Sequence, residues 1–197
     1  MRRRTLALAG LLAALAACAA DVPRQVYVLS NPATPVAGVS AASAAPTVQL
    51  QRVLVPDYLD TTEIRLRVGA HELRSSSTGR WGERLSIGVT RALRADLSAR
   101  LPMDMVLPAY PADRSALQIL ATIETFDVWP DGRCVLVATW TLVSKGGGTT
   151  AAATRVTITL PAAAPERVSD AMLVAQMAAA LDKLADRMAA SVTGSGA

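Results

Sequence analysis

One cysteine near the start of the chain lies in the setting of a lipid-modification site. Three arginines, Arg2 to Arg4, precede an apolar run over residues 5–14, and Leu-Ala-Ala-Cys follows, ending at Cys18. A basic start followed by an apolar run is typical of a secretory signal, and this run is too short to cross a bilayer, which takes about 20 residues. Small residues before a thiol match a bacterial lipobox, in which the thiol accepts a diacylglycerol and the bond before it is cut. We expect residues 1–17 to be a lipoprotein signal peptide and Cys18 to carry the lipid.

The alternative is an ordinary secretory signal cut at another bond, with Cys18 an incidental apolar residue. If Cys18 is lipidated, several acyl chains of the palmitate kind hold the protein on a membrane, because each buried methylene contributes about 0.8 kcal/mol. In lipoproteins of this kind, an aspartate directly after the cysteine tends to retain the protein at the inner membrane. That position is Ala19 here, so we expect the periplasmic face of the outer membrane.

The other residues that could do chemistry are few and scattered. His71 is the single histidine, and a lone histidine is more often a surface or core residue than a base or a ligand. The sequence has no His-Glu-x-x-His, Walker, Gly-x-Ser-x-Gly or Cys-x-x-Cys motif. Asp57, Asp60 and Glu63 surround Tyr58 and form either an acid pair or, as we favour, a solvated turn. We therefore expect no enzymatic activity, no metal and no cofactor.

Cys134 is the second of two cysteines. If Cys18 is acylated, Cys134 has no partner for an intramolecular disulfide. An exposed thiol would be a liability in the oxidising periplasm. We expect Cys134 to be a small buried apolar residue rather than a reactive or metal-binding one.

Composition indicates one domain with an aliphatic core. The chain has 197 residues, of which 51% are hydrophobic but only 4% aromatic. Its net charge is +4, and loss of the three signal arginines lowers the charge of the mature chain to +1. The basic balance therefore belongs largely to the signal, and we expect no nucleic-acid partner.

The first half of the mature chain alternates between strands and turns and then changes period. Alternating apolar residues predict strands at 27–29, 48–55, 63–68 and 71–74, with a flexible Pro-, Ala- and Ser-rich loop over 30–46 and a turn at 56–60. From 80 to 101, apolar residues recur every fourth position, which predicts an amphipathic helix capped by Ser77 or Thr78 and stopped by Pro102. A brief edge strand is expected over 103–108.

The second half predicts a sheet and a final helix. Residues 116–160 are typical of a three-stranded antiparallel meander, with turns at 129–132 and 145–148. The three glycines of the second turn precede a strand rather than a helix, so a hairpin is favoured over a phosphate cradle. A linker over 161–165 leads to an amphipathic helix over 169–191 with Ser169 as its N-cap. Its methionines could form a lipid-binding surface, although ordinary helix core is favoured.

Together these elements predict an α+β fold. We expect one mostly antiparallel sheet of about five to six strands with two amphipathic helices packed on one face. The expected division is a signal at 1–17, a lipidated N-terminus with a short strand and flexible loop at 18–47, a single domain at 48–192, and a disordered tail at 193–197.

The mature chain resembles the PqiC-type lipoproteins, the auxiliary lipoproteins of ABC-type intermembrane transport systems that carry Mce-domain proteins. The matching stretches are Tyr27 to Leu29, Val53 to Asp60, Arg80 to Leu85, Phe126-Asp127, the Leu136 to Leu142 strand with Trp140, and the alanine-rich terminal helix with Leu181 and Leu184. Residues 56–60 and 81–85 are the most specific. Gly82 stands where the family pattern has alanine.

The resemblance implies a non-enzymatic, outer-membrane lipoprotein subunit that docks a periplasmic Mce-domain protein to the outer membrane. It also implies that a homo-oligomeric ring can form. The candidate partner-binding residues are Pro56, Tyr58 and Leu59. The alternative is that these residues only shape a turn, and likewise that Trp81 is only a core residue. Two other functions stay open: a lipid- or small-ligand-binding lipoprotein with a pocket between helices and sheet, and an envelope hydrolase, for which no nucleophile with an adjacent base can be named.

Overall fold

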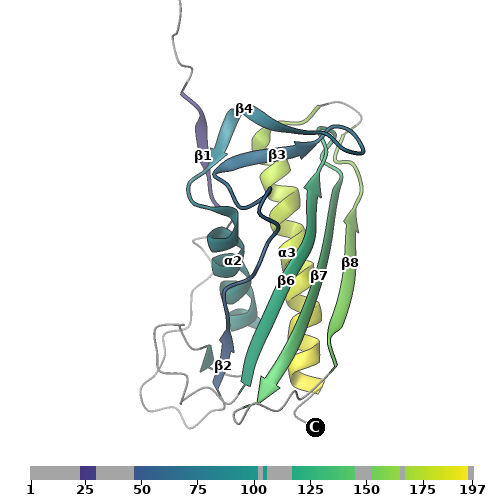
Figure 1. The fold of residues 1–197 in the computed structure, drawn as a ribbon. Coiled ribbons are helices and arrows are strands. Elements are labelled where there is room, and N and C mark those ends of the chain that lie inside the picture. The colour runs from purple at the N-terminus through teal and green to yellow at the C-terminus, as the bar shows by residue number, and fades with distance from the viewer. Residues whose placement is uncertain are drawn as a thin grey trace, which may run out of the picture.

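A computed structural model describes residues 23–29, 47–101, 104–105, 117–144, 152–164 and 167–194. The expected signal peptide, Cys18, the 30–46 loop, the 145–148 turn and the last three residues lie outside this part of the chain. Within it, the chain forms eight strands and two helices (Figure 1). In chain order these are β1 (Gln25–Tyr27), β2 (Thr47–Leu50), β3 (Glu63–Arg67), β4 (Leu73–Trp81), α2 (Leu85–Arg100), β5 (Asp104–Met105), β6 (Leu117–Val128), β7 (Cys134–Ser144), β8 (Thr154–Leu160) and α3 (Asp170–Gly194).

The larger sheet has five strands in the order β5-β2-β6-β7-β8. The strands β6, β7 and β8 form the expected antiparallel meander. In β7, alternate residues from Cys134 to Leu142 are buried, as their period of two predicts. The turn between β6 and β7 closes with the N–H of Trp129 donating to the carbonyl of Arg133 at 2.9 Å, and Gly132 takes a φ of +84°. Glycine suits this turn because a left-handed φ has no Cβ penalty there.

The smaller sheet has three strands in the order β1-β4-β3 and lies across one end of the larger sheet (Figure 1). The strands β3 and β4 are antiparallel, whereas β1 runs parallel to β4 with Tyr27 opposite Trp81. The short strand expected at 27–29 therefore lies slightly earlier, at 25–27.

Both helices lie on the same side of the five-stranded sheet (Figure 1). α3 packs against β7, β8 and α2. Its expected apolar stripe is buried, with Leu173, Met177, Leu181, Leu184 and Met188 each at most 3% exposed. Met177 and Met188 are therefore core residues, whereas Met172, at the start of the helix, is 46% exposed. Ser169 caps α3 as expected, with its hydroxyl accepting from the N–H of Met172 at 3.4 Å.

The α+β class is confirmed, but the strands divide into two sheets instead of one. Three strand pairs are parallel: β1 with β4, β2 with β5, and β2 with β6. Alternation along a sequence shows which residues share a face but not which strand lies alongside. Parallel neighbours need long connections, and both β1 and β2 are separated from their partners by such connections.

The predicted start of the first helix is wrong by five residues. β4 runs through Trp81, and α2 begins at Leu85. The polar stretch from Ser75 to Gly79 belongs to the strand because Ser76 is buried there and its hydroxyl donates to Asp170 at 2.8 Å. Ser77 and Thr78 therefore do not cap α2.

Two other boundaries also differ from expectation. The strand predicted over 48–55 ends at Leu50, and only Leu54 returns to the sheet, through an isolated bridge to Thr122. The chain leaves the sheet because the N–H of Val53 donates to the Thr90 hydroxyl of α2 at 3.0 Å. At the other end, α3 continues through Gly194 into the expected tail.

Candidate functional site

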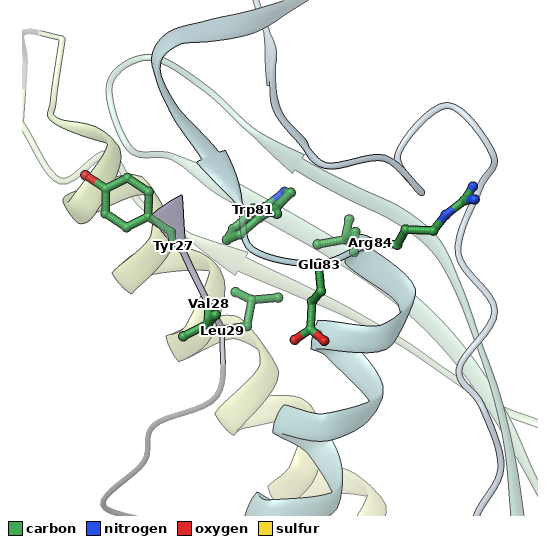
Figure 2. Close-up of a pocket in the computed structure, with 8 residues that line it drawn as sticks. Tyr27, Val28, Leu29, Trp81, Glu83 and Arg84 are labelled. Atoms are coloured by element: carbon green, nitrogen blue, oxygen red, sulfur yellow. The ribbon is translucent and has the colours of Figure 1, made fainter. Parts of the chain in front are cut away.

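Two of the stretches that carry the family resemblance, 27–29 and 80–85, meet at the N-terminus of α2 (Figure 2), and Thr61 and Thr62, directly after a third stretch, bond to the second. The N–H of Gly82 donates to the carbonyl of Tyr27 at 2.8 Å, which joins β1 to the end of β4. The N–H of Trp81 donates to Thr62 at 2.8 Å, and that of Leu85 donates to Thr61 at 3.3 Å. Residues up to 55 positions apart in sequence (Tyr27 and Gly82) are thus joined by backbone hydrogen bonds at this junction.

The junction encloses a small hollow between β1 and α2, drawn in Figure 2. Its lining comprises Tyr27, Val28, Leu29, Trp81, Glu83, Arg84, Leu85 and Gly88. Its cavity volume is only about 10 Å³, whereas ligand pockets usually have about 300–1,000 Å³. Leu29 and Trp81 are 6% and 3% exposed, so Trp81 serves as a core anchor that holds β1 against the body.

Gly82 lies close against β1, and this bears on its departure from the family pattern. A Cβ at this position would lie 3.1 Å from Cγ1 of Val26 and 3.3 Å from Cγ1 of Val28. An alanine here would require these two valines to shift by a few tenths of an ångström. The glycine therefore allows a closer approach of β1 to the start of α2.

Asp60 caps α2 from outside the helix. Arg84 occupies the N-cap position but makes no side-chain cap; instead, Asp60 Oδ1 accepts from the N–H of Ser86 at 3.0 Å. Asp60 Oδ2 lies 3.4 Å from Arg84 Nε and 3.8 Å from Arg52 Nη2. Burial acts to raise the pKa of Asp60, but the hydrogen bonds from Ser86 and the charges of Arg84 and Arg52 hold it below its ordinary value. A carboxylate here also complements the helix dipole.

The turn that contains the three candidate partner-binding residues is compact. The N–H groups of Leu59 and Asp60 both donate to the carbonyl of Pro56, at 2.9 and 3.1 Å. Tyr58 is 43% exposed and Leu59 only 3%. Leu59 is therefore a core residue, and a surface for a partner at this turn narrows to Pro56 and Tyr58.

An ion pair beside Tyr58 joins the two sheets. Arg67 of β3 donates from Nε to Asp127 Oδ2 at 3.0 Å and from Nη2 to Oδ1 at 3.1 Å. The pKa of Tyr58 is raised, mainly by partial burial and to a smaller extent by the nearby negative charge of Asp127. Asp127 belongs to the matching Phe126-Asp127 stretch, but its partner lies 60 residues away. The sequence marks Arg67 only as an outward-facing residue of an alternating strand, so no local pattern could have found this pair.

The remaining residues singled out in the sequence do not assemble into a reactive centre. Cys134 is fully buried. The pKa of its thiol is raised to about 12, mainly by this burial and to a smaller extent by the charge of Asp127. His71 is exposed between β3 and β4. Asp57 is exposed, whereas Glu63 pairs with Arg24 at 2.8 Å.

Across the described segments, no group of three or more His, Cys, Asp or Glu could hold a metal ion. No helix in those segments has the length and apolarity to cross a membrane.

Comparison with known proteins identifies the class. Residues 27–189 match the family described as the ABC-type transport auxiliary lipoprotein component, so the chain belongs to that family. The protein is thus a transport-associated, envelope lipoprotein of the PqiC-like kind. No curated protein matches it.

Two crystal structures share the fold. An uncharacterized protein is 18% identical, with 86% of this chain and 98% of that chain covered and a TM-score of 0.68. Protein XCC0632 from Xanthomonas campestris, of family DUF330, is 16% identical, with 88% and 94% covered and a TM-score of 0.61. At these identities the likeness concerns the fold alone.

Proposed function

We propose that this protein is a non-enzymatic outer-membrane lipoprotein subunit of an ABC/Mce-type intermembrane lipid transport system. In this proposal it docks the periplasmic assembly, through an Mce-domain protein, to the periplasmic face of the outer membrane. The single observation that supports it most is the family match over 27–189. The lipobox-like sequence that ends at Cys18 supplies the anchor.

The position of β1 supports a short connection between anchor and body. Cys18 lies five residues before Pro23, the first described residue, and a fully extended chain spans at most about 3.6 Å per residue. The lipidated residue would therefore lie within about 18 Å of Pro23. Backbone pairing of β1 with β4 and the burial of Leu29 then fix this segment to the domain.

Tethering is the proposed mechanism. Acyl chains on Cys18 would confine the domain to the membrane surface and raise its effective concentration near a partner. Pro56 and Tyr58 are the proposed contact residues, since Tyr58 is a partly exposed aromatic side chain on a rigid turn. Aromatic residues are enriched in protein interfaces. We also propose that the subunit assembles as a homo-oligomeric ring, which the native mass of the detergent-extracted protein would test.

The two other functions have less support. The hollow beside β1 is too small for a lipid. A larger hollow of about 560 Å³ lies between β8 and α3, but most of the side chains that line it are polar or charged. For a hydrolase, the buried Ser76 hydroxyl contacts Asp170 and Thr78, and His71 lies exposed in a turn. We therefore retain the docking function.

Site-specific photocrosslinking in envelopes tests the proposal. A photoreactive amino acid replaces Tyr58 in the full-length protein, and a matched variant carries it at Met172, which is 46% exposed on α3. The proposal expects Tyr58 to crosslink an Mce-domain protein and Met172 to do so much less. Consistent absence of any Mce-domain protein, from both crosslinks and pull-downs, would contradict it.

A further inference from the structure

An arginine-lined hollow lies between α2 and the segment after β2, and its lining shares no residue with the hollow beside β1. Ile87, Thr90, Arg91 and Arg94 are spaced i, i+3, i+4 and i+7 along the helix and so share one face. Arg52, from the segment after β2, closes the other side. The hollow has a volume of about 250 Å³, enough for a small polar group.

Two of the three guanidinium groups are held by neighbouring side chains. Arg52 donates from Nη2 to the Ser86 hydroxyl at 2.7 Å, and Arg91 donates from Nη2 to Glu83. A guanidinium has five N–H donors in a fixed planar arrangement, so these contacts leave donors on both residues. They also fix the side chains beside the hollow before any ligand binds.

Arg94 differs from these two because it has no hydrogen-bond or ion-pair partner within the described segments. Its side chain is half-buried, and its Nε is buried without a hydrogen bond. Burial lowers the pKa of Arg94. A partly buried charge is costly unless it is paired, and no carboxylate of the described residues forms an ion pair with Arg94.

We propose that this hollow binds a phosphate group, with Arg94 as the central ligand and Arg52 and Arg91 as flanking donors. Guanidinium groups bind phosphate oxygens through paired N–H donors, which gives both strength and orientation. Three arginines around one hollow suit an anion with several oxygens. Ile87 is 41% exposed at the rim and offers apolar contact to a substituent on the phosphate. A phosphodiester of a lipid headgroup and free phosphate share this chemistry. The inference concerns residues of the folded domain and does not depend on the docking partner.

A titration of the full mature protein in phosphate-free maltoside detergent tests this site. The three probes are inorganic phosphate, glycerophosphoglycerol, and dihexanoyl phosphatidylglycerol below its micelle concentration. Binding is followed through the Nε–Hε NMR signals of the arginine side chains. We expect the Arg94 signal to shift and saturate, and Arg94→Gln to weaken binding at least tenfold. The matched control is Arg187→Gln, because Arg187 is an exposed arginine on α3 outside this hollow; it should bind like the unmodified protein.

The probes distinguish the source of the phosphate. Tighter binding of dihexanoyl phosphatidylglycerol than of the chain-free diester supports a lipid headgroup, whereas equal or tighter binding of inorganic phosphate supports free phosphate. The site is overturned if no probe gives a saturable shift at Arg94, or if Arg94→Gln and Arg187→Gln weaken binding equally. Because Arg94 is half-buried, thermal unfolding is recorded for each variant to show that it is folded. Arg91→Gln provides a second variant at an exposed position. Unchanged binding by Arg91→Gln would show that Arg91 is not part of the site.

Discussion

Arg67 Nη2 lies 2.9 Å from Asp127 Oδ2, and this ion pair fastens the three-stranded sheet to the five-stranded one. Both side chains are largely buried, with 18% and 9% exposed. The pair holds β3, and through it β4 and β1, above the end of β6. In the proposed function β1 follows the lipid anchor, so this ion pair would help to hold the anchored segment on the domain.

Replacing one member of this pair should destabilise the protein strongly. We expect Asp127→Ala to lower the free energy of unfolding by about 3 kcal/mol, because it leaves the buried Arg67 charge uncompensated. The double variant Arg67→Met/Asp127→Leu should recover most of that loss. Denaturant unfolding measures both. The control is Glu124→Ala, which removes the exposed Glu124–Arg155 pair and should change little; a comparable loss in this control would contradict the assignment.

The cap on α2 should make stability depend on pH. Asp60→Ala should cost about 1–2 kcal/mol, in the range of a lost N-cap, while Asp60→Asn keeps an acceptor and reports the charge. The folded pKa of Asp60 is lowered from 3.8, so its charge stabilises the fold above about pH 4 and ceases to do so as the pH falls through the folded pKa. The difference in unfolding free energy between the unmodified protein and Asp60→Asn should therefore be full at pH 6 and shrink below pH 4. The control is Asp57→Asn: Asp57 is exposed in the same turn, so this replacement should leave the free energy of unfolding at pH 6 nearly unchanged.

Replacing Gly79 with alanine tests whether β1, β4 and α3 need to approach closely at this position. A Cβ at this position would lie 2.7 Å from Asp170 Oδ2 and 2.9 Å from Cε2 of Tyr27. Gly79→Ala should lower the unfolding free energy by about 1–3 kcal/mol through overpacking and should increase hydrogen exchange in β1. Gly194→Ala is the control, since nothing lies within 4 Å of its Cβ; equal effects from the two variants would rule out the packing explanation.

Cys134 should be chemically silent in the folded protein. Its thiol is fully buried and its pKa is raised to about 12, so almost no thiolate exists at pH 8. We expect iodoacetamide to leave Cys134 unmodified in the native protein and to alkylate it after unfolding in guanidinium. Mass spectrometry of the peptides gives the result. Rapid native alkylation would show that Cys134 is accessible.

Local patterns in the sequence were sufficient to predict the elements whose residues interact with others close to them in the chain. The meander from β6 to β8 and the apolar stripe of α3 follow from periods of two and about 3.6 residues, and Ser169 follows from capping preference. The burial of Cys134 also follows from its place in the alternation of β7.

The features that need distant partners could not be predicted in this way. Ser76 lies in a strand because Asp170, 94 residues later, accepts its hydrogen bond. Asp60 caps a helix that begins 25 residues beyond it. The prediction considered only residues next to the helix and therefore named Ser77 or Thr78, which was wrong. Leu59 was a candidate for partner contact, yet tertiary packing buries it. The sequence also could not show that Nε of Arg94 is buried without a hydrogen bond in the described part of the chain, because burial and pairing depend on the tertiary fold.

Mass spectrometry of the N-terminal peptide of protein extracted from envelopes tests the lipid-anchored docking account most directly. The account predicts that residues 1–17 are absent and that Cys18 begins the chain and carries a diacylglycerol with its acyl groups. A bare Cys18, or a chain that begins at another residue, would contradict the anchoring on which the docking function depends.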